Sequence, residues 1–223
     1  MDRDAVMARL EALADPEGRE GMARFGIATG RALGIRVPEL RRLARKIGRD
    51  HGLSQELWDT AVHEARILAS MIDNPGEVTE AQMEAWVTDF DSWDLCDQVC
   101  GNLFDRTPFA YEKAAVWSGR DEEFVTRAGF ALMAYLAVHD KKAVDADLLA
   151  FLPLIEREAV DGRNYVKKAV NWALRQIGKR NRNLNVASIA VAERIHQVDS
   201  PSARWVASDA LRELRSEAVQ ARL

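Results

Sequence analysis

Four side chains between residues 168 and 179 have the types and the spacing to hold a phosphate chain. On a helix they would share one face at positions i, i+4, i+7 and i+11. We call them the cationic stripe, which consists of Lys168, Trp172, Arg175 and Lys179. Cations bind phosphates, and an aromatic face can stack against a sugar, a base or another cation. The alternative is that Trp172 packs under a neighbouring helix, with the Lys and Arg stems lying over it.

The cationic stripe lies opposite the expected core face of a helix over about residues 164–178. With about 100° of rotation per residue, that core face consists of Val166, Ala169, Val170, Ala173, Leu174 and Ile177. A second helix, over about residues 121–138, has an expected core face of Val125, Ala128, Ala131, Leu132 and Tyr135. This arrangement leaves Arg127 at the side of the second helix.

The last helix repeats the pattern. Its expected core residues are Ala203, Val206, Ala207, Ala210, Leu211 and Leu214. Trp205 and Arg212 then point outward, at the repeat positions of Lys168 and Arg175. Because an outward basic or aromatic residue recurs in three helices, the pattern favours one surface lined by these side chains.

A second candidate constellation is the pair Trp93 and Asp97 in the segment DSWDLCDQVC. The expected core face of this helix consists of Cys96, Val99, Cys100, Leu103 and Phe104. Trp93 falls at its margin and Asp97 about 40° further round, so the two share one edge. Asp91 is expected to cap the helix and Asp94 to lie in its first turn, where negative charge is favourable. From the residues alone, Trp93 is half-buried core and Asp97 a solvated acid or the partner of an arginine.

The elements that position these residues are helices. Apolar residues recur at helical spacing almost throughout, so the sequence predicts an all-α fold. Residues 173–177 (ALRQI) recur as residues 210–214 (ALREL), and periods of about 40 residues with two helices each are typical of HEAT-like repeats. We therefore predict an α-α superhelix forming a single domain over residues 1–223, with a concave basic and aromatic face.

Charge is strongly segregated along the chain. The net charge of −4 argues against a polyanionic partner. However, residues 163–192 contain seven basic residues and no acid, and residues 31–49 contain seven basic residues against Glu39. Residues 67–105 show the opposite pattern, with nine acids and no Lys or Arg. The two basic segments could share one surface.

Several classes of protein are not expected. Cys96 and Cys100 lack a second pair for a metal site or a disulfide framework, which fits a reducing compartment. The four histidines lack ligand spacing, and there is no glycine-rich phosphate loop. The N-terminus does not resemble a signal peptide, and no apolar run approaches the roughly 18 residues of a membrane span. We expect a cytoplasmic monomer without metal, cofactor or membrane.

The combined motifs resemble the AlkD family of DNA glycosylases, which are HEAT-like-repeat proteins that remove alkylated purines from DNA. Residues 93–97 (WDLCD) match the family's catalytic segment of Trp, Asp, two variable residues and Asp. Arg127 matches an Arg that opens a repeat helix, and Trp172 with Arg175 matches a Trp followed three residues later by Arg. GIRVPELRRLAR is similar to the first basic helix. The resemblance covers about residues 24–215, and it departs at Ser92, where many members have a second Trp.

The resemblance implies a monofunctional glycosylase acting on cationic alkylated purines, such as 3-methyladenine and 7-methylguanine, in duplex DNA that stays largely stacked. Asp97, Trp93 and Trp172 would be the catalytic residues. The residues implied to hold DNA phosphates are Arg127, Lys168, Arg175 and Lys179. No Lys in these motifs is placed as an amine nucleophile.

The acidic segment around Asp97 would repel a phosphate chain, which keeps two alternatives open. One is a noncatalytic binder of damaged or branched DNA that uses the cationic stripe. The other is a HEAT-like scaffold whose acidic patch binds a basic protein.

Overall fold

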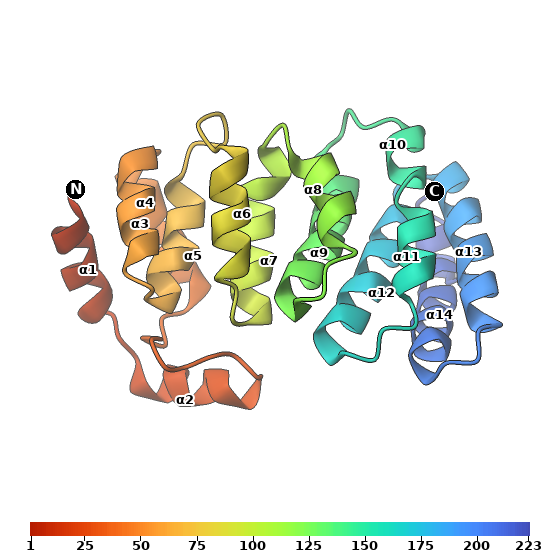
Figure 1. Cartoon of the computed structure of the whole chain (residues 1–223), viewed down its shortest axis with the longest axis horizontal. Helices are drawn as coiled ribbons and strands as arrows, with labels where there is room; N and C mark the ends of the chain where they lie inside the picture. Colours follow the sequence, from red (N-terminus) through yellow and green to blue (C-terminus); the bar gives the residue numbers. More distant parts are fainter. The chain divides into compact units, whose positions relative to one another are not determined.

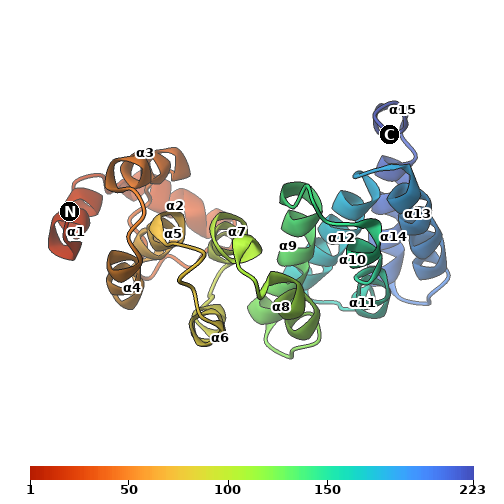
Figure 2. The same cartoon turned by 90° about the horizontal axis from the view of Figure 1, so that it is seen from above.

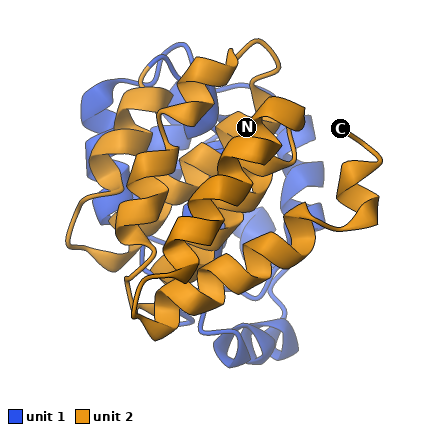
Figure 3. Ribbon diagram, turned by 90° about the vertical axis from the view of Figure 1, so that its right-hand side faces the viewer, with its two compact units in different colours: residues 1–108 blue, residues 109–223 orange.

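The computed structural model describes residues 1–223 and contains only helices, turns and loops, so the prediction of an all-α fold is confirmed (Figure 1). The chain divides into two compact units, residues 1–108 and 109–223, which Figure 3 colours separately. Each unit is described by itself below. That residues 1–223 form a single domain stays a prediction.

Unit 1 contains seven α-helices and one short 3-10 helix. Their bounds are α1 Arg3–Glu11, α2 Pro16–Arg24, α3 Val37–Ile47, α4 His51–Asp59, α5 His63–Ile72, α6 Glu80–Thr88, α7 Trp93–Asn102 and η1 Phe104–Arg106. Helix α5 packs against α3, α4 and α7. Seen from above, α3, α5 and α7 form one layer and α4 and α6 a second (Figure 2). Helix α2 runs across the ends of these helices (Figure 1).

Local capping explains where several helices of unit 1 begin. The side chains of Asp2, Asp15, Asp50 and Thr79 each accept a hydrogen bond from a backbone N–H in the first turn of α1, α2, α4 and α6. These N–H groups have no partner within the helix, so a side-chain acceptor satisfies them. Helix α3 ends at Gly48, whose φ of 82° is favourable only for glycine.

Unit 2 contains the helices that carry the cationic stripe. Their bounds are α8 Ala110–Trp117, α9 Glu123–His139, α10 Asp145–Leu149, α11 Leu152–Glu158, α12 Asn164–Gly178, α13 Arg182–His196, α14 Pro201–Leu214 and α15 Glu217–Gln220. Helix α12 packs between α9 and α14. Gly129 lets α8 approach α9 closely, because a Cβ at this position would lie 2.5 Å from the backbone N of Ser118.

The predicted core faces of unit 2 are largely confirmed. All six predicted core residues of α12 are fully buried. In α9, Tyr135 is only half-buried, and its ring lies edge-on against Trp172 with the centroids 5.0 Å apart. In α14, Leu211 is also half-buried rather than core. The helix after it, α15, was not predicted.

Candidate nucleic-acid site

Trp93 and Asp97 lie on the margin of α7 in unit 1. The five predicted core residues of this segment are fully buried, which confirms the core face. Trp93 and Asp97 are both half-buried. The indole Nε1 of Trp93 donates a hydrogen bond to the backbone oxygen of Phe25 at 3.0 Å. The predicted edge therefore exists, and one of its side chains is tied to the segment that follows α2.

The start of α7 differs from the prediction. Ser92, not Asp91, is the residue at the N-cap position, and no side chain there caps the helix. Asp91 is exposed and accepts a hydrogen bond from the Ser92 hydroxyl at 3.2 Å. The expectation that Asp91 caps the helix was therefore wrong, because the chain enters the helix one residue later.

The sequence analysis did not identify Phe25 as a neighbour of Trp93. It ends α2, and its side chain is 70% exposed. Gly26 has a φ of 72°, and the N–H of Ile27 returns to the carbonyl of Met22, which closes the end of the helix. The backbone of Phe25 is held by two hydrogen bonds, because its N–H donates to the carbonyl of Met22 and its carbonyl accepts from Trp93. Its ring faces solvent. A single aromatic residue before a glycine has no spacing or motif from which a contact with Trp93 could be predicted.

Asp94, which is half-buried, pairs with the buried His63, the first residue of α5. Nε2 of His63 lies 2.9 Å from the Asp94 carboxylate. Burial would lower the pKa of His63, but the hydrogen bond and charge of Asp94, with Glu64 and Asp91 nearby, raise it above its ordinary value. Burial would raise the pKa of Asp94, but the bond and charge of His63 lower it. The prediction that Asp94 lies in the first turn of the helix is confirmed. The sequence analysis assigned Asp94 no partner and His63 no role, yet the pair fixes this first turn of α7.

Glu64, next to His63, anchors a loop instead of a helix. Its carboxylate accepts hydrogen bonds from the backbone N–H groups of Leu33, Gly34 and Ile35 at 2.7 to 3.1 Å. Glu64 is 1% exposed. The first turn of α5 therefore holds both α7, through His63, and the loop that leads into α3.

The cationic stripe lies on α12 in unit 2, and its members differ in exposure. Lys168 is exposed and forms no ion pair. Trp172 is half-buried against Tyr135, so part of the predicted packing alternative holds for its ring. Arg175 and Lys179 both pair with Glu213 of α14, with 2.7 Å between the Lys179 Nζ and the carboxylate. Arg175 also lies 3.7 Å from the carboxylate of Asp209.

Arg127 is placed differently from the prediction. It is 6% exposed rather than lateral, and its guanidinium donates to the backbone oxygen of Tyr165 at 2.7 Å. The cause is the packing of α12 on α9, which covers the side of α9 where Arg127 lies. Arg127 thus ties α9 to the start of α12, and little of it is accessible.

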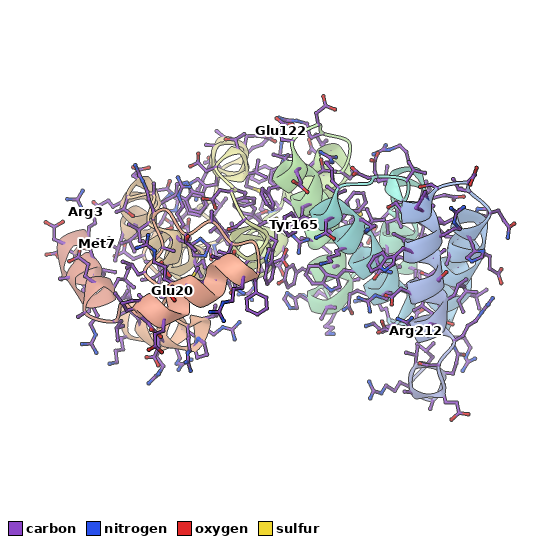
Figure 4. All side chains as sticks on the ribbon, turned by 90° about the horizontal axis from the view of Figure 1, so that it is seen from below. Arg3, Met7, Glu20, Glu122, Tyr165 and Arg212 are labelled. Carbon is purple, nitrogen blue, oxygen red and sulfur yellow. The ribbon has the colours of Figure 1, made fainter.

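Trp205 and Arg212 point outward from α14, as predicted. Trp205 is 41% exposed, and Arg212 extends from α14 beside Asp209, with which it pairs (Figure 4). Of the predicted site residues, Trp93 and Asp97 belong to unit 1 and the other five to unit 2. The structure therefore describes the predicted site in two parts.

Comparison with known proteins identifies the family. The model of the family described as "DNA alkylation repair enzyme" matches residues 6–214. The chain belongs to this family.

The family assignment agrees with the fold of a solved structure. That structure is described as "A new family of proteins related to the HEAT-like repeat DNA glycosylases with affinity for branched DNA structures". It aligns with this DNA alkylation repair family member with a TM-score of 0.79 over 95% of each chain, at 19% identity. This likeness confirms the HEAT-like helical fold. No curated protein matches the chain.

The acidic segment of this DNA alkylation repair family member is partly internal. Asp73 is fully buried and accepts hydrogen bonds from Ser54 and Gln82. Asp89 accepts from the guanidinium of Arg66 at 2.7 Å and from Trp58 at 2.9 Å. With Asp94 paired to His63, the surface around Asp97 is less acidic than the sequence suggests.

No cluster of three or more His, Cys, Asp or Glu side chains that could hold a metal ion occurs in residues 1–223. No helix has both the length and the apolar character needed to span a membrane.

Proposed function

We propose that this protein is a monofunctional DNA glycosylase that releases cationic alkylated purines, of the 3-methyladenine and 7-methylguanine type, from duplex DNA. The observation that carries the proposal is the pair Trp93 and Asp97, half-buried on one edge of α7 in a chain of the DNA alkylation repair family. An aromatic ring and a carboxylate on one accessible edge are the groups that a developing cation needs.

The chemistry begins with a weakened bond. Alkylation at N3 or N7 leaves a positive charge on the purine, so the base leaves with the electrons of its bond to C1′ and becomes neutral. The sugar then carries oxocarbenium character, which the Asp97 carboxylate stabilises. A water adds its oxygen to C1′ and gives up a proton to Asp97 or to solvent, which leaves an abasic site. Trp93 and Trp172 pack on the sugar and favour the cation through their ring faces.

The cations of unit 2 hold the DNA backbone in this proposal. Lys168 is ready to bind a phosphate because no ion pair occupies it. Arg175 and Lys179 share Glu213, so a phosphate competes with one carboxylate for two cations. Arg127, with only 6% of its surface exposed, contributes mainly by holding the start of α12 and offers a phosphate little more than an edge.

The test measures release of the base. Purified protein is incubated with methylated duplex DNA, and free 7-methylguanine and 3-methyladenine are quantified by mass spectrometry. Asp97→Asn should reduce release by two or more orders of magnitude, about 3 kcal/mol of transition-state stabilisation. Asp91→Asn is the matched control, because it removes an exposed acid of the same segment and should leave the rate unchanged.

Equal rates for Asp97→Asn and the unaltered protein would remove Asp97 from the mechanism. If the folded protein releases no base at all, the glycosylase proposal fails.

A second candidate function is noncatalytic binding of branched DNA. The observation that favours it is the solved relative with the same fold, which is described as having affinity for branched DNA structures. Under this function, binding to a four-way junction would exceed binding to a plain duplex, while no base is released from methylated DNA. Failure to bind any DNA at about 50 mM salt would exclude both functions, because a surface with several cations binds the phosphates of DNA strongly at low salt.

A further inference from the structure

Trp205 is an exposed aromatic side chain that the proposed reaction does not use. It lies on the outward face of α14, one turn from the helix start, and 41% of it is exposed. The Nζ of Lys167 lies 5.2 Å from the centroid of the ring. Leaving a large aromatic side chain in contact with water is less favourable than burying it.

The platform beneath Trp205 is fixed by hydrogen bonds between two helices. Asn171 of α12 is buried, and its side-chain amide donates to the backbone oxygen of Val206 at 3.1 Å. Ser202, in the first turn of α14, donates to the backbone oxygen of Asp161 just before α12. Trp205 lies between these two bonds along α14, so the backbone that carries its ring is held in place.

The charges around Trp205 favour an anionic partner. Lys167 contacts the ring but forms no ion pair, and its neighbour Lys168 is exposed and also forms none. Arg212, two turns further along α14, pairs with Asp209 but keeps 77% of its side chain exposed. Arg204 pairs with the fully exposed Asp199. The unneutralised charge nearest the ring is therefore positive.

An exposed aromatic ring with a lysine ammonium beside it is suited to a nucleobase and its phosphates. The bases inside a duplex have both faces covered by neighbouring base pairs, whereas an unpaired base leaves its faces free to stack on a protein ring. We propose that Trp205, with Lys167, is a stacking platform for an unpaired nucleobase in a single-stranded segment of the bound DNA. This inference rests on the proposed function only in taking DNA as the partner.

The test compares three unmodified DNA probes at about 50 mM salt by fluorescence anisotropy. They are a blunt duplex, the same duplex with a single-stranded overhang, and the single strand alone. The unaltered protein should bind the overhang probe more tightly than the blunt duplex. Trp205→Ala should weaken binding to the overhang probe fivefold or more, while its affinity for the blunt duplex stays within twofold.

Three further variants separate stacking from folding and from charge. Trp205→Phe keeps an aromatic face, so it should keep most of the preference for the overhang. Val186→Ala is a matched control, because it truncates an apolar side chain of α13 that is 64% exposed. Lys168→Gln should weaken binding to all three probes alike and reduce the salt dependence by about one phosphate contact.

The outcomes discriminate between the two proposals. If Trp205→Ala binds every probe as the unaltered protein does, no base stacks on Trp205, and a protein partner becomes the better explanation of the exposed ring. If Trp205→Ala weakens the blunt duplex as much as the overhang, the stacking proposal also fails. Base release from methylated DNA, measured on the same samples, reports on the glycosylase independently.

Discussion

The acidic segment of unit 1 and the basic segment of unit 2 differ in how the folded chain neutralises them. In unit 1, Asp94 pairs inside the protein with His63, which is 5% exposed. In unit 2, Arg175 and Lys179 pair with Glu213 at a position where all three side chains keep about 30% of their surface exposed. A ligand phosphate can compete for the second arrangement but not for the first. We call His63 with Asp94 the locked pair, and Arg175 and Lys179 with Glu213 the exchangeable cluster.

The largest expected effect breaks the locked pair. Asp94→Ala leaves a buried histidine without its carboxylate, so the free energy of unfolding should fall by about 3 kcal/mol. Asp91→Ala, three residues earlier and exposed, should change it by less than about 0.5 kcal/mol. Urea unfolding at pH 6 measures both. Equal stabilities of the two variants would show that the His63–Asp94 pair does not hold α7.

The shifted pKa values of His63 and Asp94 predict that stability depends on pH, with an effect smaller than that of Asp94→Ala. Because the pKa of His63 is raised in the folded chain, its contribution is complete below the unfolded value of about 6.5 and is lost as pH rises through the higher folded value. Because the pKa of Asp94 is lowered, its contribution is present above about 3.9 and is lost as pH falls through the lower folded value.

Unfolding experiments between about pH 4 and pH 9 test this dependence. The unaltered protein should lose stability as pH rises above neutrality, and Asp94→Asn, which keeps an acceptor but no charge, should lose much less. A pH profile that is the same for both proteins would contradict the assignment of the pair.

The smallest expected effect tests whether the exchangeable cluster binds phosphates. Glu213→Gln releases Arg175 and Lys179 to phosphates, so affinity for duplex DNA should rise about fivefold, roughly 1 kcal/mol, with a steeper dependence on salt. Stability should fall by less than about 1 kcal/mol, because the pairs are partly exposed. Glu193→Gln is the control, since Glu193 pairs with Arg215 away from the stripe. Unchanged affinity in Glu213→Gln would mean that Arg175 and Lys179 do not meet DNA.

The fold was predictable wherever local periodicity determines it. The segment 164–178 matches α12, and its six apolar positions are all buried, because the 3.6-residue period fixes which side of the helix meets the core. The edge shared by Trp93 and Asp97 follows from the same rule. Such predictions need only the sequence within one helix.

The environment of the charged residues was not predictable, because it depends on other helices. Arg127 is buried by α12, whose Tyr165 lies 38 residues further along the chain. Glu213 reaches Arg175 across the same number of residues. Phe25 meets Trp93 across 68 residues, through a backbone oxygen that has no residue-specific signal. Periodicity indicates which side chains face outward, but not which partner meets them there.

Glu64 gives the loop before α3 a further property. Three successive N–H groups curving around one carboxylate resemble the backbone cradles that hold phosphates in other proteins. In this chain the anion is a covalent part of α5, so the cradle is filled from the time the protein folds. The segment leading into the basic helix α3 is therefore held in its anion-bound shape by the protein itself. A ligand of α3 would therefore not have to order this loop.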